Sequence, residues 1–177
     1  MKLVILDRDG TINVDSDQYI KSPAEWRPIP GSLEAIARLT QAGYRLVVAT
    51  NQSGIARGLF DVATLNAIHD EMHRAVAQAG GRIEAVFFCP HAADSDCACR
   101  KPKPGMLLEI GRRFNVALEE VDMVGDALRD LQAAEAAGAR PVLVLTGKGR
   151  ATQDAGGLPA ATRVFSDLAT FAAQLAP

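Results

Sequence analysis

The sequence lacks long hydrophobic runs, and neither sign of charge is in clear excess. No apolar stretch approaches the ~20 residues of a membrane-spanning helix, and the apolar start of the chain stops at Asp7. We therefore expect no membrane contact and no signal peptide, and we predict a cytoplasmic protein. The 21 acidic residues nearly balance the 19 basic ones, whereas nucleic-acid-binding domains usually carry a basic excess. No nucleic-acid partner is expected.

Cysteine is also scarce, since the chain has only three, all between positions 89 and 99. Such a cluster in a cytosolic protein favours metal binding or catalysis over disulfide bridges. With 177 residues, 48% of them hydrophobic, the chain can bury a core without disulfides. We expect a single domain over residues 1–177, because no linker or internal repeat interrupts the pattern. No long apolar surface stripe suggests a dimer, and we predict a monomer.

Short apolar runs alternate with amphipathic stretches along the whole chain. Strands are predicted at 2–6, 44–49, 83–88, 121–124, 141–145 and 163–165, and helices at 32–43, 61–80, 104–114, 128–137 and 167–175. Ser32 is the expected N-cap of the first helix, and residues 147–157 are expected to form a loop. This alternation predicts an α/β fold of three layers, with a Rossmann-like parallel sheet between helices.

Polar side chains follow four of these strands. Asp7 and Asp9 follow the first strand, and residues 50–53 follow the second. Arg100 and Lys101 end the loop after the third strand, and Asp126 follows the fourth. Each alone has an ordinary explanation, such as a turn, a helix cap or a solvated lysine. Ligands of such sheets bind at the carboxyl ends of the strands, so the ordered set favours a common site. Paired carboxylates repel unless a cation lies between them, and the inventory suits Mg²⁺-assisted phosphoryl transfer.

These motifs resemble those of haloacid-dehalogenase-type phosphatases. The similar segments are Asp7-Arg8-Asp9-Gly10-Thr11, Thr50-Asn51, Lys101-Pro102, and Gly125-Asp126 with Asp130. The resemblance covers almost the whole chain and implies the haloacid-dehalogenase fold. No insertion is long enough for a cap domain, so we expect an essentially capless enzyme with an open site.

The resemblance also implies residue roles. Asp7 would be the nucleophile that forms an aspartyl-phosphate, and Asp9 the general acid and then the general base. Thr50 and Lys101 would hold the transferred phosphoryl oxygens. Asp7, the backbone carbonyl of Asp9, and Asp126 would bind Mg²⁺.

A second constellation lies in residues 89–99, where Cys89, His91, Cys97 and Cys99 fall within eleven residues. Three cysteines and one histidine match a closed, tetrahedral structural zinc site, which leaves no open position for catalysis. The alternative is a set of free thiols in a loop. We predict zinc, whose task would be to fold this loop and fix the Arg-Lys pair that follows it.

The zinc loop followed by Arg-Lys-Pro, with the opening LDRDGTIN, resembles the D,D-heptose 1,7-bisphosphate phosphatases. That family implies hydrolysis of the 7-phosphate of a heptose bisphosphate, leaving heptose 1-phosphate for lipopolysaccharide precursors. The segments that would contact the sugar phosphate contain Asp15, Ser16, Asp17, Gln18, Asn51, Gln52, Ser53 and Arg100. The close sister family, the histidinol-phosphate phosphatases, shares the zinc loop and remains the alternative.

Two functions of other classes are weaker explanations. A phospho-signalling receiver domain would need its acceptor aspartate at a later strand end than the acidic pair, where this chain has Thr50 and Cys89. A zinc-dependent interaction module would leave the carboxylates unexplained. His69 and His73, spaced as in a zinc-protease helix, are predicted to lie on a solvated helix face.

Overall fold

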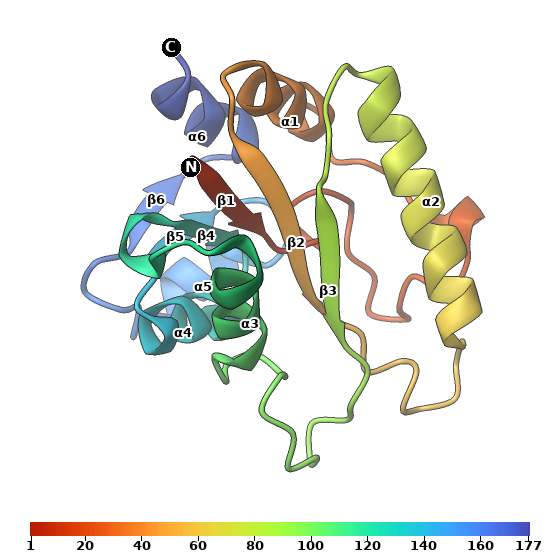
Figure 1. Cartoon of the computed structure of the whole chain (residues 1–177). Helices are drawn as coiled ribbons and strands as arrows, with labels where there is room; N and C mark the ends of the chain where they lie inside the picture. The colour runs from red at the N-terminus through yellow and green to blue at the C-terminus, as the bar shows by residue number, and fades with distance from the viewer.

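The computed structural model describes residues 1–177 and contains one six-stranded parallel sheet (Figure 1). The strands are β1 (Leu3–Leu6), β2 (Arg45–Asn51), β3 (Ala85–Cys89), β4 (Asp122–Gly125), β5 (Arg140–Val144) and β6 (Arg163–Phe165). Their order is β3-β2-β1-β4-β5-β6, so the chain builds outward from β1 in one direction and then crosses to its other side. Such a reversal opens a crevice at the carboxyl ends of the two central strands, β1 and β4.

Helices connect the strands throughout. They are α1 (Ser32–Gln41), α2 (Val62–Gln78), α3 (Gly105–Phe114), α4 (Leu128–Ala137), α5 (Gly149–Ala155) and α6 (Leu168–Leu175), with short 3-10 turns η1 (Pro23–Glu25) and η2 (Leu118–Glu120). In Figure 1, α1 and α6 lie side by side at the top, and the green loop between β3 and α3 extends at the bottom. No helix is both long enough and apolar enough to cross a membrane.

Each face of the sheet is covered by its own core, as the predicted three-layer fold requires. In β1, which is fully buried, Val4 and Leu6 belong to the core beneath α1, α2 and α6, whereas Leu3 and Ile5 belong to the core beneath α3 and α4. A strand that is buried on both faces has apolar residues at successive positions, and this pattern allowed β1 to be predicted from the sequence. The three-layer prediction is confirmed.

The long connection from β1 to α1 is held in place by apolar side chains. Ile12, Ile20 and Trp26 are buried in the core beneath α1, α2 and α6. No domain is inserted in this connection or between β3 and α3. The carboxyl ends of the strands therefore remain uncapped.

Two local predictions were wrong. Ser32 is not the N-cap of α1: Gly31 occupies that position with φ +85°, and the Ser32 hydroxyl donates to the Thr11 carbonyl at 2.9 Å. Residues 147–157 are not only a loop, because α5 forms within them. Its sequence has no apolar period, and it is anchored by the Thr152 hydroxyl, which donates to the Asp126 carbonyl at 2.8 Å.

Candidate active site

Three buried carboxylates meet at the crevice between β1 and β4. Asp7 directly follows β1, Asp126 follows β4, and Asp130 lies in the first turn of α4. The strands align the first two, since the Asp7 N–H donates to the Val124 carbonyl at 2.8 Å. One oxygen from each carboxylate lies within 4.8 Å of the others, and each residue is at most 4% exposed.

One buried cation lies against these acids. The Lys101 ammonium donates to Asp7 Oδ1 at 2.8 Å and to the Ala49 carbonyl at 2.7 Å, and it lies 2.7 Å from Asp130 Oδ1. Burial by itself would lower the pKa of Lys101, but the charges of Asp130 and Asp7 hold it above its ordinary value. The ammonium therefore stays charged and neutralises only part of the acidic cluster.

The remaining negative charge raises the pKa of two carboxyl groups. Burial, reinforced by the charges of Asp7 and Asp130, raises the pKa of Asp126 to about 8. Burial and the charge of Asp130 raise the pKa of Asp7 to about 6, against the opposing effect of Lys101. Buried carboxylate oxygens with unneutralised charge are the donor set that Mg²⁺ prefers. The residues present fit a magnesium ion.

Asp9 has a different environment, because its carboxylate accepts four hydrogen bonds. Oδ1 accepts from Arg8 Nε at 3.0 Å, Arg8 Nη2 at 2.8 Å and Asn13 Nδ2 at 3.0 Å. Oδ2 accepts from Gln52 Nε2 at 3.1 Å. Burial would raise the pKa of Asp9, but the Arg8 charge and these donors outweigh it and hold the pKa below its ordinary value.

The end of β2 connects the acidic cluster to the segment that carries Lys101. The Asn51 side chain accepts from the Lys101 N–H and donates to the Lys101 carbonyl, both at 3.0 Å. The buried Thr50 hydroxyl accepts from Gln52 Nε2 at 3.0 Å. Thr50 is thus linked through Gln52 to Asp9, whereas Lys101 contacts Asp7 and Asp130 directly.

A cavity of about 220 Å³ is lined by residues next to the acidic cluster in the sequence, including Asp9 and Arg129, but not by Asp7, Asp126 or Asp130 themselves. Of the residues predicted to contact substrate, those that line it are Asp15, Ser16, Asp17, Asn51, Gln52, Ser53 and Arg100, together with Asp9. Gln18 instead lines the neighbouring cavity of about 340 Å³.

Three cations in the cavity wall were missed from the sequence: Arg57, Arg129 and Lys148. Lys148 lies 3.4 Å from Asp15, although its segment was predicted to be an ordinary loop. Arg129 directly precedes the fourth-motif residue Asp130, which was a usable signal. No pattern in the sequence pointed to Arg57, which stacks over the Tyr19 ring at 5.8 Å.

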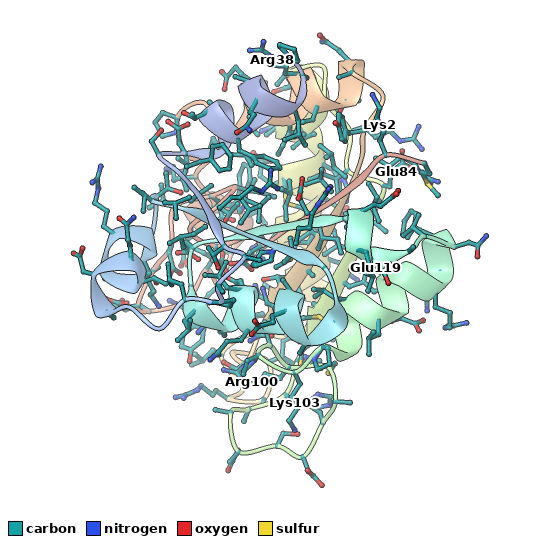
Figure 2. All side chains as sticks on the ribbon, turned by 90° about the vertical axis from the view of Figure 1, so that its left-hand side faces the viewer. Lys2, Arg38, Glu84, Arg100, Lys103 and Glu119 are labelled. Carbon is teal, nitrogen blue, oxygen red and sulfur yellow. The ribbon has the colours of Figure 1, made fainter.

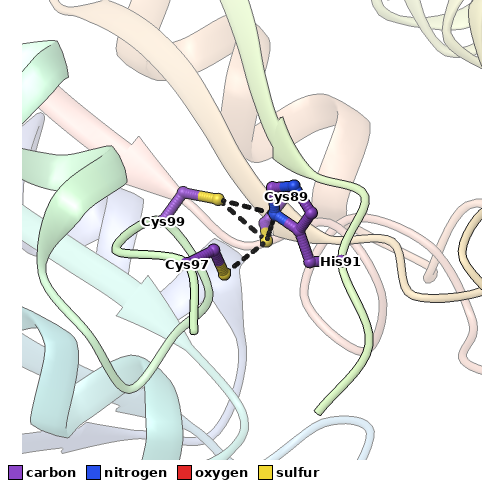
Figure 3. A group of neighbouring side chains, drawn as sticks. All are labelled: Cys89, His91, Cys97 and Cys99. Atoms are coloured by element: carbon purple, nitrogen blue, oxygen red, sulfur yellow. Dashed lines mark hydrogen bonds between the residues drawn. The ribbon is translucent and has the colours of Figure 1, made fainter. Parts of the chain in front are cut away.

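The four predicted zinc ligands lie together at the carboxyl end of β3 (Figure 3). Cys89 Sγ is 3.7 Å from Cys97 Sγ, 3.0 Å from Cys99 Sγ and 3.4 Å from His91 Nδ1. A tetrahedral zinc with Zn–S bonds of ~2.3 Å places its sulfur ligands about 3.7 Å apart. Burial and the Cys99 thiol raise the pKa of Cys89 to about 12, so a metal would have to displace its proton.

The cysteine loop lies at the same end of the molecule as the acidic cluster. Figure 2 shows Arg100 and Lys103 there, opposite Lys2 and Glu84, which precede their strands. The Lys103 ammonium donates to the Cys97 carbonyl at 2.6 Å, and the Gly105 N–H donates to the Ala98 carbonyl at 3.1 Å. The loop is therefore bonded to the segment that carries Arg100.

The prediction that His69 lies on a solvated helix face was wrong. His69 is only 6% exposed, and its Nε2 lies 3.1 Å from Nη1 of Arg8, which is fully buried. The apolar residues of α2 do not indicate this burial; it follows from the buried Arg8 guanidinium, which needs an acceptor. Burial and the Arg8 charge lower the pKa of His69 to about 3.

Comparisons with known proteins agree with this geometry. A family model described as HAD-hydrolase-like matches residues 98–171. D-glycero-beta-D-manno-heptose-1,7-bisphosphate 7-phosphatase of Bordetella bronchiseptica is 65% identical over 99% of this chain and 98% of its own length. The protein of that name from Pseudomonas putida is 55% identical, over 99% of each chain.

Solved structures agree as well. The D,D-heptose 1,7-bisphosphate phosphatase from B. bronchiseptica, complexed with magnesium and phosphate, superposes with a TM-score of 0.97 at 64% identity and covers 99% of this chain and 98% of its own. The D,D-heptose 1,7-bisphosphate phosphatase from Burkholderia thailandensis gives a TM-score of 0.80 at 57% identity, with the same coverage. Because its sequence and its fold both match these relatives over almost the whole chain, the chain belongs to the heptose-1,7-bisphosphate 7-phosphatase family of haloacid-dehalogenase-like hydrolases.

Proposed function

We propose that residues 1–177 act as one phosphatase domain that hydrolyses the 7-phosphate of D-glycero-β-D-manno-heptose 1,7-bisphosphate. The observation that carries the proposal is the contact between Asp7 and Lys101 beside Asp126 and Asp130. Asp9 and Arg129, which are close to these residues in the sequence, line a cation-rich cavity. A carboxylate nucleophile held by an ammonium is suited to accept a phosphoryl group. The names of the 65% and 55% identical relatives support the sugar and its β anomer.

In the first step, an Asp7 oxygen attacks phosphorus, and the bond between phosphorus and the sugar oxygen breaks. The pKa of Asp9 is low in the free enzyme, and the negative charge of the bound substrate phosphate would raise it so that Asp9 takes up a proton. Asp9 then gives this proton to the departing sugar oxygen, so heptose 1-phosphate leaves as an alcohol and Asp7 carries an acyl phosphate. In the second step, Asp9 takes a proton from a water molecule as that water attacks phosphorus. Inorganic phosphate leaves, and the Asp7 carboxylate is restored.

Thr50 and Lys101 are proposed to hold the oxygens of the phosphoryl group as it moves. Asp7, Asp126 and the backbone carbonyl of Asp9 would hold Mg²⁺. When bound, the metal neutralises negative charge and lets an anionic nucleophile approach an anionic phosphate. The raised pKa values of Asp7 and Asp126 support this need for a cation.

Zinc is proposed to occupy the cluster of Cys89, His91, Cys97 and Cys99 in a structural role. The supporting observation is that all four ligand atoms lie within 4.8 Å of one another, Cys89 at the end of β3 and the other three in the loop that follows it. Four protein ligands complete the coordination of a structural zinc. Its effect on catalysis would be indirect, through the position of Arg100 and Lys101.

The wall of the cavity favours a bisphosphate over histidinol phosphate. Its four cations are Arg57, Arg100, Arg129 and Lys148, and its three carboxylates belong to Asp9, Asp15 and Asp17. The heptose substrate keeps a second phosphate, which surplus positive charge attracts, whereas histidinol phosphate presents an ammonium group instead. We therefore place the retained 1-phosphate near this wall.

The test is phosphate release with Mg²⁺ from the α and β anomers of heptose 1,7-bisphosphate and from histidinol phosphate, measured in parallel. The proposal predicts fastest release of one phosphate from the β anomer and none from an Asp7→Asn variant that still folds. Preference for the α anomer would correct the anomer alone. Efficient release from histidinol phosphate only would overturn the substrate, and no release from any of the three would contradict the function.

A further inference from the structure

Arg8 is a fully buried arginine between the two motif aspartates, and the proposed reaction assigns it no role. Its Nε and Nη2 both donate to Asp9 Oδ1, at 3.0 and 2.8 Å. Its Nη1 lies 3.1 Å from Nε2 of His69, a residue 61 positions away on α2. Every hydrogen bond of the guanidinium thus ends on Asp9 or on His69.

We infer that Arg8 and His69 are positioning residues that lock the Asp9 carboxylate, so that Oδ2 is the oxygen that carries the proton. This inference rests on the proposed function, because it needs Asp9 as the acid and base. The inference adds to the proposed function a specific oxygen, Oδ2 of Asp9, and a residue of α2, His69, that contacts Arg8.

The two oxygens of Asp9 are unequally occupied. Oδ1 accepts three N–H groups, two from Arg8 and one from Asn13 Nδ2 at 3.0 Å. Oδ2 accepts only one, from Gln52 at 3.1 Å. A carboxylate oxygen offers about two lone-pair sites, so Oδ1 has no room for a proton while Oδ2 keeps a free one. The side chain of Asp9 is 23% exposed and lines the cavity, where Oδ2 can meet a substrate oxygen.

His69 fixes the other end of Arg8. A guanidinium can only donate, so Nε2 of His69 must be the unprotonated nitrogen and the neutral ring must carry its proton on Nδ1. The position of the ring is set by its helix, because Leu65, Ile68 and Met72 of α2 are all buried. Docking of α2 on the sheet therefore sets the orientation of Arg8, and through Arg8 that of Asp9.

Loss of this support should matter most for substrates with poor leaving groups. A sugar alkoxide needs the proton of Asp9 in order to leave, whereas 4-nitrophenolate leaves without it. A variant that merely destabilises the fold would lower turnover of both esters by the same factor. The ratio of the two kcat/KM values, which covers only the first step, therefore reports on proton donation by Asp9 and not on the amount of folded enzyme.

The experiment compares three variants on heptose 1,7-bisphosphate and 4-nitrophenyl phosphate. His69→Leu removes the acceptor, His69→Gln places an amide oxygen near the position of Nε2, and His73→Leu, one turn further along α2, controls for changes to the helix. We expect His69→Leu to lose at least about tenfold in kcat/KM on the heptose ester but under about threefold on the nitrophenyl ester, because kcat/KM reports the phosphoryl transfer to Asp7 and leaves out the water attack that both esters share. His69→Gln should recover most of the loss, and His73→Leu should match the wild type on both.

Equal losses on the two esters, or no rescue by His69→Gln, would overturn the inference. If His69→Leu does not fold, His69→Asn replaces it, because its shorter amide cannot reach Arg8, and it should show the same selective loss relative to His69→Gln. A wild type that hydrolyses the nitrophenyl ester but not the heptose ester would refute the proposed substrate alone. A simple alkyl phosphate would then serve as the ester with the poor leaving group, and the same ratio would decide the inference.

Discussion

Replacing Lys101 by methionine tests whether this lysine is the internal counter-ion of the acidic cluster. Its ammonium has three oxygen neighbours, at 2.8 Å from Asp7 and at 2.7 Å from both Asp130 and the Ala49 carbonyl, and its side chain is 1% exposed. Methionine fills similar space but leaves two buried carboxylates facing each other. Removing one partner of a buried ion pair typically costs about 3–5 kcal/mol, because the remaining charge stays buried. That is a large part of a typical total stability of about 5–15 kcal/mol.

The sign of the pH dependence follows from the same geometry. Lys101 lowers the pKa of Asp7, so without it the folded state binds protons more readily than before. A folded state that holds extra protons loses stability as the pH rises. The deficit of the variant should therefore be largest above the wild-type Asp7 pKa of about 6 and shrink below it.

The assay is urea unfolding without added magnesium, from pH 5 to pH 8 in wild type and variant. Lys2→Met removes the same charge from an exposed side chain at the opposite end of the sheet, and it should cost well under about 1 kcal/mol. Chelators are left out because they would also strip zinc. Equal, small losses in both variants would refute the counter-ion role of Lys101.

The remaining predictions concern metals and protons. Burial and the neighbouring acids raise the pKa of Asp126 to about 8 and that of Asp7 to about 6, so Mg²⁺ must displace protons in order to bind. Its affinity, measured by calorimetry, should therefore rise from pH 6 to pH 8, with proton release on binding. An affinity that does not change with pH would contradict this. Cys97→Ser should lose zinc by metal analysis and raise KM or lower kcat severalfold, and a zinc-free variant with wild-type kinetics would rule out the loop-scaffold role. Because the folded pKa of His69 is depressed to about 3, its stabilising contribution is present above pH 6.5 and is lost as the pH falls toward 3. Wild type should therefore lose stability more steeply than His69→Gln between pH 6.5 and pH 4, and parallel curves in urea titrations would contradict a neutral, buried His69.

The strands and helices could be predicted from the sequence where burial requires a run or a periodic pattern of apolar residues. Strands such as Leu3–Leu6 are buried on both faces and appear as apolar runs, and the glycine that ends α4 has a left-handed conformation that favours glycine. α5 was missed because its seven residues, Gly149–Ala155, carry no apolar stripe and are held by bonds to Asp126, which accepts from the Lys148 N–H and from the Thr152 hydroxyl. Such tertiary contacts leave no periodic trace.

In the candidate site, too, the residues that are close in the sequence could be predicted, and those brought together by packing could not. The four proposed zinc ligands lie within eleven residues, so their spacing alone suggested the cluster. The contact between Lys101 and Asp130 could not be predicted from spacing. It depends on how α4 begins, where Asp130 Oδ2 accepts from the Ala127 N–H at 3.0 Å. Arg57 comes from a segment with no motif, and the spacing of His69 and His73 suggested only a zinc-protease helix, so neither the place of Arg57 in the cavity wall nor the contact of His69 with Arg8 could be predicted.

The most direct test of the account is to identify the residue that carries the phosphoryl group. Wild-type enzyme turning over heptose 1,7-bisphosphate with Mg²⁺ is quenched in acid, treated with borohydride, which reduces an acyl phosphate to an alcohol, and analysed by peptide mass spectrometry. The account predicts homoserine in place of aspartate at Asp7 and an unchanged Asp9. Reduction at Asp9, or at neither residue in enzyme quenched during rapid turnover, would contradict it.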